Sequence, residues 1–425
     1  MKSEICIGCI ADDFTGAGDA ASFLREGGWN TILLSGVPSE DIRLRDCQAV
    51  VVALKTRMVP LSEAVRESLS AALWLKRQGA RRLYFKYCST FDSLKKGNIG
   101  PVIDAILEKM GQQATLLCPA APVNGRTVLN GKLYVHGVPL HESAMKDHPL
   151  TPMWDCYIPA LMKEQGKYSC LVLDREAMQG RREDIKRRIE EYGWNQEHFY
   201  IVPDYETEED AYRITELFGG MGFLTGGSGL LEGLAKRTQD IEQFRKRPEN
   251  VKHQRPGKTL LLAGSCSAMT LKQIDRYKKL RLPFYKILPE TVLDSSIDRK
   301  QVVQMMKTAG NGPVLFYCSD QPAAAAQVAA CMGGDIAQKL EQVMAGLSLA
   351  AYEQGFKNFI VAGGETSGAV IKALGFNGFR IGDSIAPGVP ILAPLKNPDV
   401  HLILKSGNFG TEDFFEEAIR RIGNS

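Results

Sequence analysis

Two adjacent carboxylates near the start of the chain are the first residues whose types and spacing could support chemistry. Asp12 and Asp13 follow the short apolar run 5–10 and precede a stretch of small residues that can open a helix. In open α/β sheets, ligands bind where the carboxyl end of a strand gives way to a helix. Adjacent side chains of a strand point to opposite faces, so one carboxylate can face a hydroxyl group or a cation. The alternative is a helix start at which Asp satisfies free backbone N–H groups.

The residues that follow contain a second pattern. The run Thr-Gly-Ala-Gly-Asp-Ala at 15–20 is similar to the signature of ribokinase-type sugar kinases, in which the Asp is the catalytic base. In that family the signature lies late in the chain, whereas here it lies near the beginning. A ribokinase-like sugar kinase that uses Asp19 is therefore a minority alternative.

A cation followed by hydroxyl side chains ends the predicted strand 82–87. The motif reads Lys-Tyr-Cys-Ser-Thr-Phe-Asp-Ser at 86–93, and Arg57 follows the preceding predicted strand. Ammonium and guanidinium groups bind carboxylates, and hydroxyl groups bind sugar-like oxygens, so a polyhydroxy acid is the expected ligand. The alternative is a Ser/Thr-rich turn whose lysine reaches solvent. The candidate substrate residues here are Arg57, Lys86, Tyr87, Cys88 and Ser89.

Three turns rich in Gly, Ser and Thr follow strands in the second half of the chain. Close backbone approach and the N–H groups of a helix start are suited to phosphate, although each turn alone is equally typical of a strand-to-helix connection. A Walker A motif is absent, so the chain is not a P-loop protein. Together the turns predict a nucleotide site. The candidate residues are Ser265, Ser267, Gly363, Gly364, Glu365, Thr366 and Gly407.

Composition excludes several other classes of protein. A length of 425 residues favours roughly two or three domains. A net charge of +3 gives no reason to expect nucleic acid or an anionic membrane as the main partner. We find no apolar run long enough for a membrane span and no signal peptide. The 10 cysteines lie mostly in apolar runs, as reduced cysteines do, and the six histidines lack ligand-like spacing. These features predict a cytoplasmic protein without a structural metal.

The order of apolar and amphipathic segments predicts two α/β domains with mainly parallel sheets and an active site in the cleft that separates them. Residues 1–240 are expected to bind the acid, 241–258 to form a charged linker, and 259–425 to bind the nucleotide. An inserted hairpin or flap is expected at 127–152. Strands are predicted at 31–35, 49–54, 82–87, 114–118, 170–173, 199–202, 222–225, 259–263, 284–288, 314–317, 358–362 and 401–405. Helices are predicted at 61–78, 102–110, 176–192, 208–218 and 335–354.

Taken together and in order, five motifs resemble those of the four-carbon acid sugar kinases. They are Ala-Asp-Asp-Phe-Thr-Gly-Ala at 11–17, the motif at 86–93, Pro-Val-Asn-Gly-Arg-Thr at 122–127, Ala-Gly-Gly-Glu-Thr-Ser-Gly at 362–368 and Ser-Gly-Asn-Phe-Gly at 406–410. Within the family, Gly-Asn-Ile-Gly-Pro at 97–101 and His-Pro-Leu-Thr-Pro-Met at 148–153 look most like the 3-oxo-tetronate 4-kinases. Threonate and erythronate kinases are near relatives.

This resemblance implies an ATP-dependent kinase whose first domain binds the acid sugar and whose second binds ATP. It places Asp12, Arg57 and 86–89 in the substrate region, with Asp12 as the expected base. It places 363–366, Gly407 and either Ser265 or Ser267 in the ATP region. The choice between the two serines stays open because Ala263 stands where relatives often have Ser. Mg²⁺ is expected to bind mainly through the ATP phosphates.

Two other functions are consistent with the first domain. A threonate or erythronate kinase, or a small-acid-binding protein without catalysis, would share the motifs of the first domain. The three phosphate-type turns of the second domain are the feature against a pure binding protein. The expected partners are a small acid sugar and ATP, with neither nucleic acid nor membrane, and homo-oligomerisation is undecided.

Overall fold

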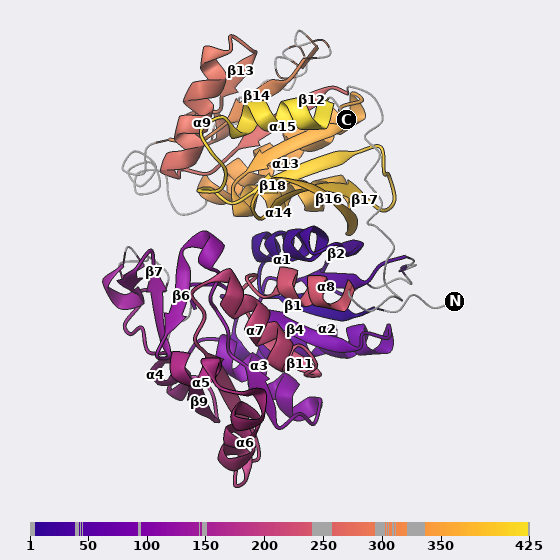
Figure 1. Ribbon diagram of the computed structural model, residues 1–425. Helices are drawn as coiled ribbons and strands as arrows, with labels where there is room; N and C mark the ends of the chain where they lie inside the picture. Colours follow the sequence, from indigo (N-terminus) through magenta and orange to yellow (C-terminus); the bar gives the residue numbers. More distant parts are fainter. Residues whose placement is uncertain are drawn as a thin grey trace. The chain divides into compact units, whose positions relative to one another are not determined.

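The structure is a computed structural model, and it describes residues 5–38, 42, 44, 46–91, 95–143, 145, 146, 151–239, 257–293, 302, 304, 306, 307, 310, 312–320 and 336–423. Parts of some sequence predictions lie outside these residues. They are Asp92 and Ser93, the motif residues 148–150, most of the predicted linker 241–258, and the first residue of the predicted helix 335–354. The chain divides into two compact units, Met1–Pro248 and Glu249–Ser425, and each is described by itself (Figure 1).

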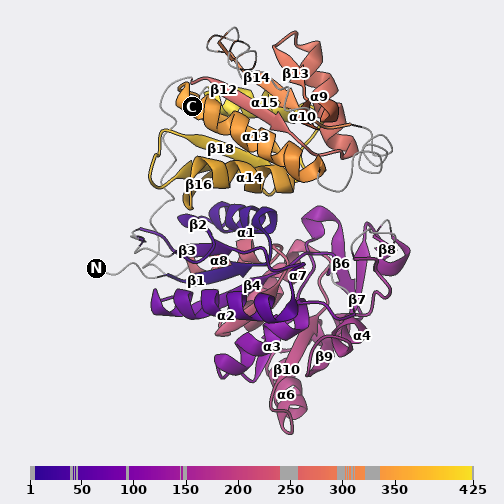
Figure 2. The same cartoon turned by 180° about the vertical axis from the view of Figure 1, so that it is seen from behind.

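The first unit is built on a parallel sheet with the strand order β11-β4-β1-β3-β2. The strands are β1 (Ile7–Ala11), β2 (Thr31–Ser35), β3 (Ala49–Ala53), β4 (Arg82–Lys86) and β11 (Phe223–Gly226). β1 and β3 are buried along their whole length, as the near-continuous apolar runs of a sheet covered on both faces require. Helices α1 (Phe14–Glu26) and α2 (Leu61–Arg77) lie on opposite faces of this sheet (Figures 1 and 2). Because the five strands are parallel, their carboxyl-terminal ends meet at one edge of the sheet.

Two smaller sheets and the remaining helices complete the first unit. The strands β5 (Ala114–Leu116), β9 (Ser169–Leu173) and β10 (Phe199–Pro203) form a parallel sheet in the order β5-β10-β9. The hairpin expected at 127–152 is present as β6 (Arg126–Leu129), β7 (Lys132–Val135) and β8 (Val138–Pro139), which pair antiparallel. The helices are α3 (Ile99–Lys109), α4 (Ile158–Lys163), α5 (Arg175–Gln179), α6 (Arg182–Gly193), α7 (Glu208–Phe218) and α8 (Leu231–Gln239).

One predicted helix of this unit is wrong. The segment 176–192 forms two helices, α5 and α6, because Gly180 and Arg181 are extended, with ψ of 171° and 149°. The side chain of Asp174 accepts from the backbone N–H of Ala177 and fixes the start of the first helix. The break follows from backbone conformation at a glycine, which the amphipathic pattern does not reveal.

The second unit contains one sheet with the strand order β16-β17-β18-β15-β12-β14-β13. The strands β18, β15, β12, β14 and β13 are parallel, and β16 and β17 add an antiparallel pair. The strands are β12 (Thr259–Ala263), β13 (Phe284–Lys286), β14 (Val314–Tyr317), β15 (Asn358–Ala362), β16 (Gly378–Ala386), β17 (Val389–Pro394) and β18 (His401–Lys405). The sequence prediction did not include β16 and β17. Pro390 and Pro394 lie in β17, and proline is unusual inside strands.

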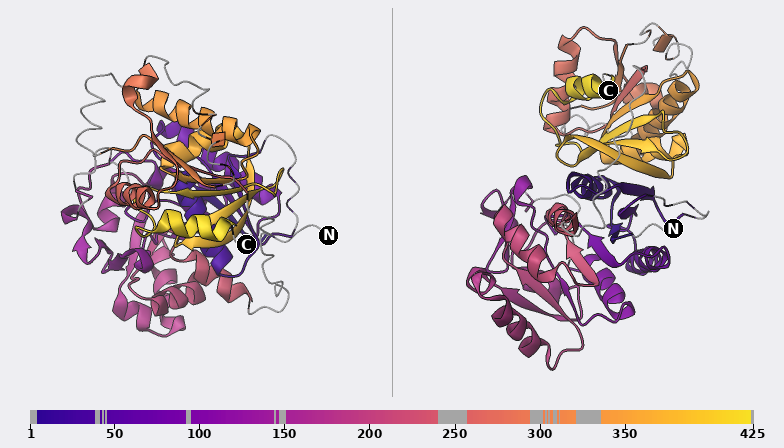
Figure 3. Two further views of the ribbon diagram at one scale, coloured as in Figure 1. Left: turned by 90° about the horizontal axis from the view of Figure 1, so that it is seen from above. Right: turned by 45° about the vertical axis from the view of Figure 1, so that its right-hand side comes forward.

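Helices cover both faces of this second sheet. They are α9 (Ala268–Lys279), α10 (Pro289–Leu293), α13 (Ile336–Glu353), α14 (Gly364–Leu374) and α15 (Phe414–Gly423). Helices α9 and α15 lie on one face, and α13 lies on the other with α14 packed against it (Figure 3). The two α/β units with mainly parallel sheets confirm the predicted fold class. No helix formed by the described residues is both long enough and apolar enough to cross a membrane.

Candidate functional site

Asp12 and Arg57 form a bidentate ion pair at the carboxyl end of the first sheet. Arg57 donates from Nε to Asp12 Oδ2 at 2.9 Å and from Nη2 to Asp12 Oδ1 at 2.8 Å. The backbone carbonyl of Asp12 also accepts from the N–H groups of Thr56 and Arg57, which ties the ends of β1 and β3 together. Burial alone would lower the pKa of Arg57, but the carboxylates of Asp12 and Asp13 raise it well above its ordinary value. Both oxygens of Asp12 are thus already engaged.

Asp13 has two structural partners. Its Oδ1 accepts from the N–H of Gly16 at 2.8 Å, so it caps the start of α1, and it lies 3.0 Å from Nη2 of Arg57. About 31% of its side chain is exposed, against 5% for Asp12, so Asp13 is the more accessible of the two carboxylates. The capping role that the sequence offered as the alternative reading is therefore present, together with the ion pair.

A second polar cluster lies beside this pair and is centred on Asp19. The carboxylate of Asp19 is 8% exposed, and one of its oxygens accepts from the hydroxyl of Ser228, while Oδ1 has no hydrogen-bond partner. Burial raises the pKa of Asp19, and the positive charges of Lys86 and Arg126 and the Ser228 hydrogen bond partly offset that effect. Buried carboxylate oxygens without partners are rare in folded proteins and indicate a place for a ligand or water.

The cations of this cluster come from β4 and the hairpin. Lys86 is buried, and its Nζ donates to the carbonyl of Tyr87 at 3.0 Å. A side-chain carbon at Gly16 would lie 3.1 Å from this Nζ, which places the ammonium beside the start of α1. Arg126 begins β6, and its buried Nε has no hydrogen-bond partner. The sequence analysis did not include Arg126 among the site residues, although the loop motif at 122–127 contains it.

Tyr87 is fully buried in the core, where it packs against Phe85 and Phe91. The hydroxyl of Thr225 donates to the Tyr87 hydroxyl at 3.4 Å, and burial raises the pKa of Tyr87 well above its ordinary value. A contact of Tyr87 with a ligand would therefore have to come from its backbone.

Cys88 and Ser89 lie beyond the end of β4 and are partly exposed. The Cys88 thiol lies 2.9 Å from the hydroxyl of Thr90. A side-chain carbon at Gly227 would lie 3.5 Å from Cβ of Ser89, so Ser89 faces the turn that follows β11. Ser89, near Gly227, and Asp19, through its bond to Ser228, thus both approach the Gly-Gly-Ser turn at 226–228.

In the second unit, the three predicted turns converge around Ser265. A side-chain carbon at Gly407 would lie 2.8 Å from Ser267 Oγ and closer still to Ser265 Oγ, and one at Gly264 would clash with Thr366 Oγ1. Gly363 precedes α14 with φ of +128°, a conformation that glycine tolerates. The N-terminus of α14, whose first residue is Gly364, therefore lies at this region, and the N–H groups of a helix start suit an anion.

Ser265 and Ser267 have different local roles. The Ser267 hydroxyl accepts from the N–H of Thr270 at 3.3 Å and caps α9, whereas Ser265 Oγ accepts from the N–H of Ser267 at 3.2 Å. Of the two serines, Ser265 lines the adjacent cavity and Ser267 does not. This arrangement favours Ser265 as the serine that contacts a ligand.

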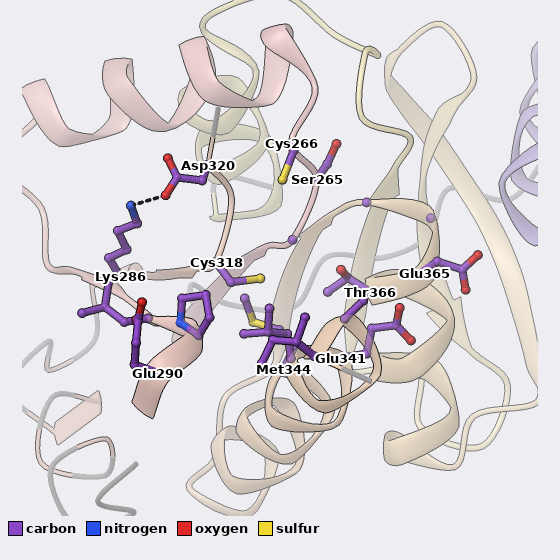
Figure 4. A pocket seen from close by; sticks show the side chains of 18 residues that line it. Ser265, Cys266, Lys286, Glu290, Cys318, Asp320, Glu341, Met344, Glu365 and Thr366 are labelled. Atoms are coloured by element: carbon purple, nitrogen blue, oxygen red, sulfur yellow. Dashed lines mark hydrogen bonds and ion pairs between the residues drawn. The ribbon is translucent and has the colours of Figure 1, made fainter. Parts of the chain in front are cut away.

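A cavity of about 420 Å³ opens beside these turns, large enough for a nucleotide fragment. Ser265, Gly363, Gly364, Glu365 and Thr366 line one side of it. Figure 4 shows the other side, where Lys286 donates to Asp320 at 2.7 Å and where Glu290, Glu341 and Met344 project from α10 and α13. No motif in the sequence indicates this second wall. It is made of scattered residues, and only the topology of the sheet brings them together.

The first unit contains a different group of ligand-type side chains. Among the described residues, His141, Asp155 and Cys156 bring one ligand atom each to within 4.8 Å of one another, a proximity that the sequence spacing did not indicate. Asp155 Oδ1 already accepts from the N–H groups of Cys156 and Tyr157. Burial, followed by the charge of Asp155, raises the pKa of the Cys156 thiol.

Comparison with known proteins first defines the class. Residues 7–234 match the family described as "Sugar-binding N-terminal domain", and residues 260–415 match "Nucleotide-binding C-terminal domain". The chain belongs to this two-domain family. The match agrees with the resemblance drawn from the five motifs, which is thereby confirmed.

Individual relatives carry the name of one particular kinase within this family. A Brucella melitensis protein named 3-oxo-tetronate kinase is 41% identical over 99% of this chain and 96% of its own length. A Haemophilus influenzae protein of the same name is 40% identical over 97% of this chain and 98% of its own.

Solved structures agree with these relatives in fold. A crystal structure of a Haemophilus influenzae protein has a TM-score of 0.82 at 40% identity and covers 97% of this chain and 98% of its own. A Salmonella typhimurium protein, described as a proposed tRNA synthase, has a TM-score of 0.88 at 38% identity, with 98% and 99% covered. The curated Salmonella typhimurium relative, also 38% identical, is named 3-oxo-tetronate kinase.

Proposed function

We propose that this chain is an ATP-dependent kinase that phosphorylates the 4-hydroxyl group of 3-oxo-tetronate. The observation that carries the proposal is identity of about 40% to proteins named 3-oxo-tetronate kinase over nearly the full length of both chains. The polar cluster of the first unit and the cavity of the second supply the two kinds of site that such a reaction needs.

The first unit, taken as residues 1–240, is the proposed acid-sugar domain. Lys86 and Arg126 offer positive charge to the substrate carboxylate, and Arg126 Nε is a buried donor without a partner. Arg57 was the sequence candidate for this clamp, but it is occupied by Asp12 and Asp13. We therefore assign Arg57 to holding the two carboxylates in place and the carboxylate clamp to Lys86 and Arg126.

Asp12 is the proposed proton acceptor, as the family resemblance implies, and Asp19 is its competitor. In the proposed step the 4-hydroxyl oxygen attacks the γ-phosphorus, the bond to ADP breaks, and the hydroxyl proton passes to the carboxylate. Asp12 lies at the strand end but has both oxygens bound to Arg57, whereas Asp19 has one oxygen without a partner. Comparing the two Asn variants distinguishes these roles.

The second unit, taken as residues 259–425, is the proposed ATP domain. The N–H groups at the start of α14 and the hydroxyls of Ser265 and Thr366 suit phosphate oxygens. Ile336, Leu340 and Met344, which also line the cavity, offer apolar contacts that suit a base. Glu341 and Glu365 line the same cavity, and hard oxygen donors of this kind fit Mg²⁺. Mg²⁺ bound with ATP would neutralise charge on the transferred phosphoryl group. Positioning the reactants can account for about 7–11 kcal/mol of the barrier.

An ATP-consumption screen of the full chain tests this proposal. The panel contains 3-oxo-tetronate, threonate and erythronate, with a reaction that lacks any acid as the control. We expect ADP release with 3-oxo-tetronate to exceed that with either reduced acid by at least about tenfold, because an alcohol at carbon 3 brings an O–H donor and a tetrahedral carbon into a site built for a planar, accepting keto group. Turnover of threonate or erythronate alone would reassign the substrate. ATP binding without turnover of any acid would contradict the kinase proposal.

A further inference from the structure

Lys405 is a buried cation outside the residues that line the nucleotide cavity. It ends β18, and the residue is only 1% exposed. Its Nζ donates to Thr270 Oγ1 at 3.1 Å and to the carbonyl of Gly407 at 2.8 Å. Both acceptors are neutral, and among the residues that the structure describes Lys405 has no ion-pair partner. A buried charge without a counter-ion is expensive, so a function is expected to account for it.

Among the described residues, helices α9 and α15 and strand β15 supply no compensating charge at Lys405. Helix α9 presents the neutral Thr270, and α15 presents the ring of Phe414, whose centroid is 5.9 Å from Nζ. The nearby charged residues of these segments are engaged elsewhere. Lys272 pairs with Glu412 at 2.8 Å, Arg276 pairs with Glu416, and Asp413 accepts from Thr411. The neighbouring strand β15 is apolar where it pairs with Lys405, at Ala362.

Hydrogen bonds connect Lys405 to two of the three ligand turns. Thr270 Oγ1, which accepts from Lys405, donates to the carbonyl of Gly407 at 2.8 Å and accepts from Ser267 Oγ at 3.2 Å. Gly407 in turn packs against the hydroxyls of Ser265 and Ser267. Through these bonds, the Lys405 ammonium connects the 406–410 turn to the first turn of α9.

We propose that Lys405 is a positioning residue for ATP, which holds these turns under the nucleotide phosphates and takes up a proton from solvent when the phosphates bind. The inference rests on the assignment of the cavity to ATP. Burial lowers the pKa of Lys405 to about 7, so the free protein near neutral pH contains both forms of the amine. A bound polyanion favours the charged form, and by linkage a group that gains charge on binding takes up a proton.

Calorimetry of the full chain with a non-hydrolysable ATP analogue measures this proton directly. Binding enthalpies at pH 8, in buffers that differ in ionisation enthalpy, give the number of protons taken up. A group with a pKa of about 7 carries roughly 0.1 proton at pH 8, so the expected uptake is roughly 0.9 proton. The phosphates can also titrate, so the informative quantity is the difference between the wild type and Lys405→Met. Lys372→Met, at an exposed site on α14, is the matched control for loss of one positive charge.

We expect Lys405→Met to lose about 0.9 proton of uptake and to bind the analogue roughly tenfold or more weakly at pH 7, since a neutral side chain exerts no attraction. Lys405→Arg, which stays charged, should bind well without the extra uptake, and Lys372→Met should match the wild type. Equal affinity and uptake in the wild type and Lys405→Met would overturn the inference and leave the kinase proposal intact. Failure of both the wild type and Lys372→Met to bind the analogue would overturn the ATP assignment itself. If Lys405→Arg does not fold, the comparison with Lys405→Met still decides.

Discussion

The two candidate sites use different chemistry to hold their ligands. In the first unit, charged side chains of opposite sign face one another, with Asp12 paired to Arg57 and Asp19 near Lys86 and Arg126. In the second unit, glycine turns, hydroxyls and the start of α14 surround the cavity, and the buried Lys405 lies beneath them. A small acid is recognised by charges at fixed positions, whereas a polyphosphate can be recognised by many backbone N–H groups. Side-chain changes should therefore dominate in the first unit and backbone changes in the second.

The largest effect is expected from Asp12→Asn. Loss of the proposed proton acceptor should lower kcat by roughly 10²–10⁴-fold while ATP affinity changes only a few-fold. The amide keeps the shape of the side chain and one acceptor for Arg57, so the fold should persist. Steady-state kinetics and ATP titration on the same preparation measure both effects.

Asp19→Asn is the matched control for this variant. If Asp12→Asn keeps a tenth or more of the wild-type kcat and Asp19→Asn does not, the base is Asp19. Loss of ATP affinity in Asp12→Asn would instead contradict the assignment of the acid sugar to the first unit and of ATP to the second.

Lys86→Met should weaken binding of the acid sugar by about ten- to hundredfold, because it removes a charge-assisted contact worth roughly 1.5–3 kcal/mol. The KM for ATP should stay unchanged, and Lys109→Met on the surface of α3 should behave as the wild type. Arg57→Ala is expected to weaken the acid as well, but also to lower Tm, because it leaves Asp12 buried without its partner. A rise in the KM for ATP alone would reverse the roles of the units.

A pair of glycine variants separates ligand contact from backbone strain in the second unit. Gly364→Val should raise the KM for ATP at least about tenfold with little change in Tm, because Gly364 is helical and lines the cavity. Gly363→Ala should lower Tm as well, since φ of +128° is strained for alanine by about 1–3 kcal/mol. An unchanged KM in Gly364→Val would remove this turn from the phosphate site.

The smallest expected effect is the pH dependence of stability due to Lys405. Its pKa is about 7 in the folded protein and higher when unfolded, so between these values the unfolded chain binds more protons. This group therefore makes the free protein more stable as pH rises from about 7 toward 10. Lys405→Met should reduce that rise in Tm, and a saturating ATP analogue should reduce it in the wild type. A slope that is identical in Lys405→Met and the wild type would show that the lysine does not titrate in this range.

The sequence was most informative where local patterns determine structure. The runs 49–54 and 358–362 predicted β3 and β15 nearly to the residue, because apolar β-rich runs bounded by turns leave few alternatives. The turns at 264–267, 363–366 and 406–407 were predicted as members of one site, and they lie together because they follow parallel strands of one sheet.

Pairings over long sequence distances could not be predicted in this way. The Asp12–Arg57 pair, the approach of Ser228 to Asp19 and the cavity wall of Lys286, Asp320 and Met344 depend on topology. Likewise, the positive φ lies at Gly363, whereas the doublet in the sequence does not indicate which glycine requires it. The sequence located the motifs, and tertiary packing determined which of their atoms are free.

The position of the phosphate on the product tests the central claim most directly. After turnover of ATP and 3-oxo-tetronate by the full chain, proton-coupled phosphorus NMR reports the hydrogens next to the phosphoester. A phosphate on the 4-hydroxyl is coupled to the two hydrogens of a CH₂ group and gives a triplet, which is the result that we predict. A doublet from the single hydrogen at carbon 2, or a singlet from an acyl phosphate, would contradict the account.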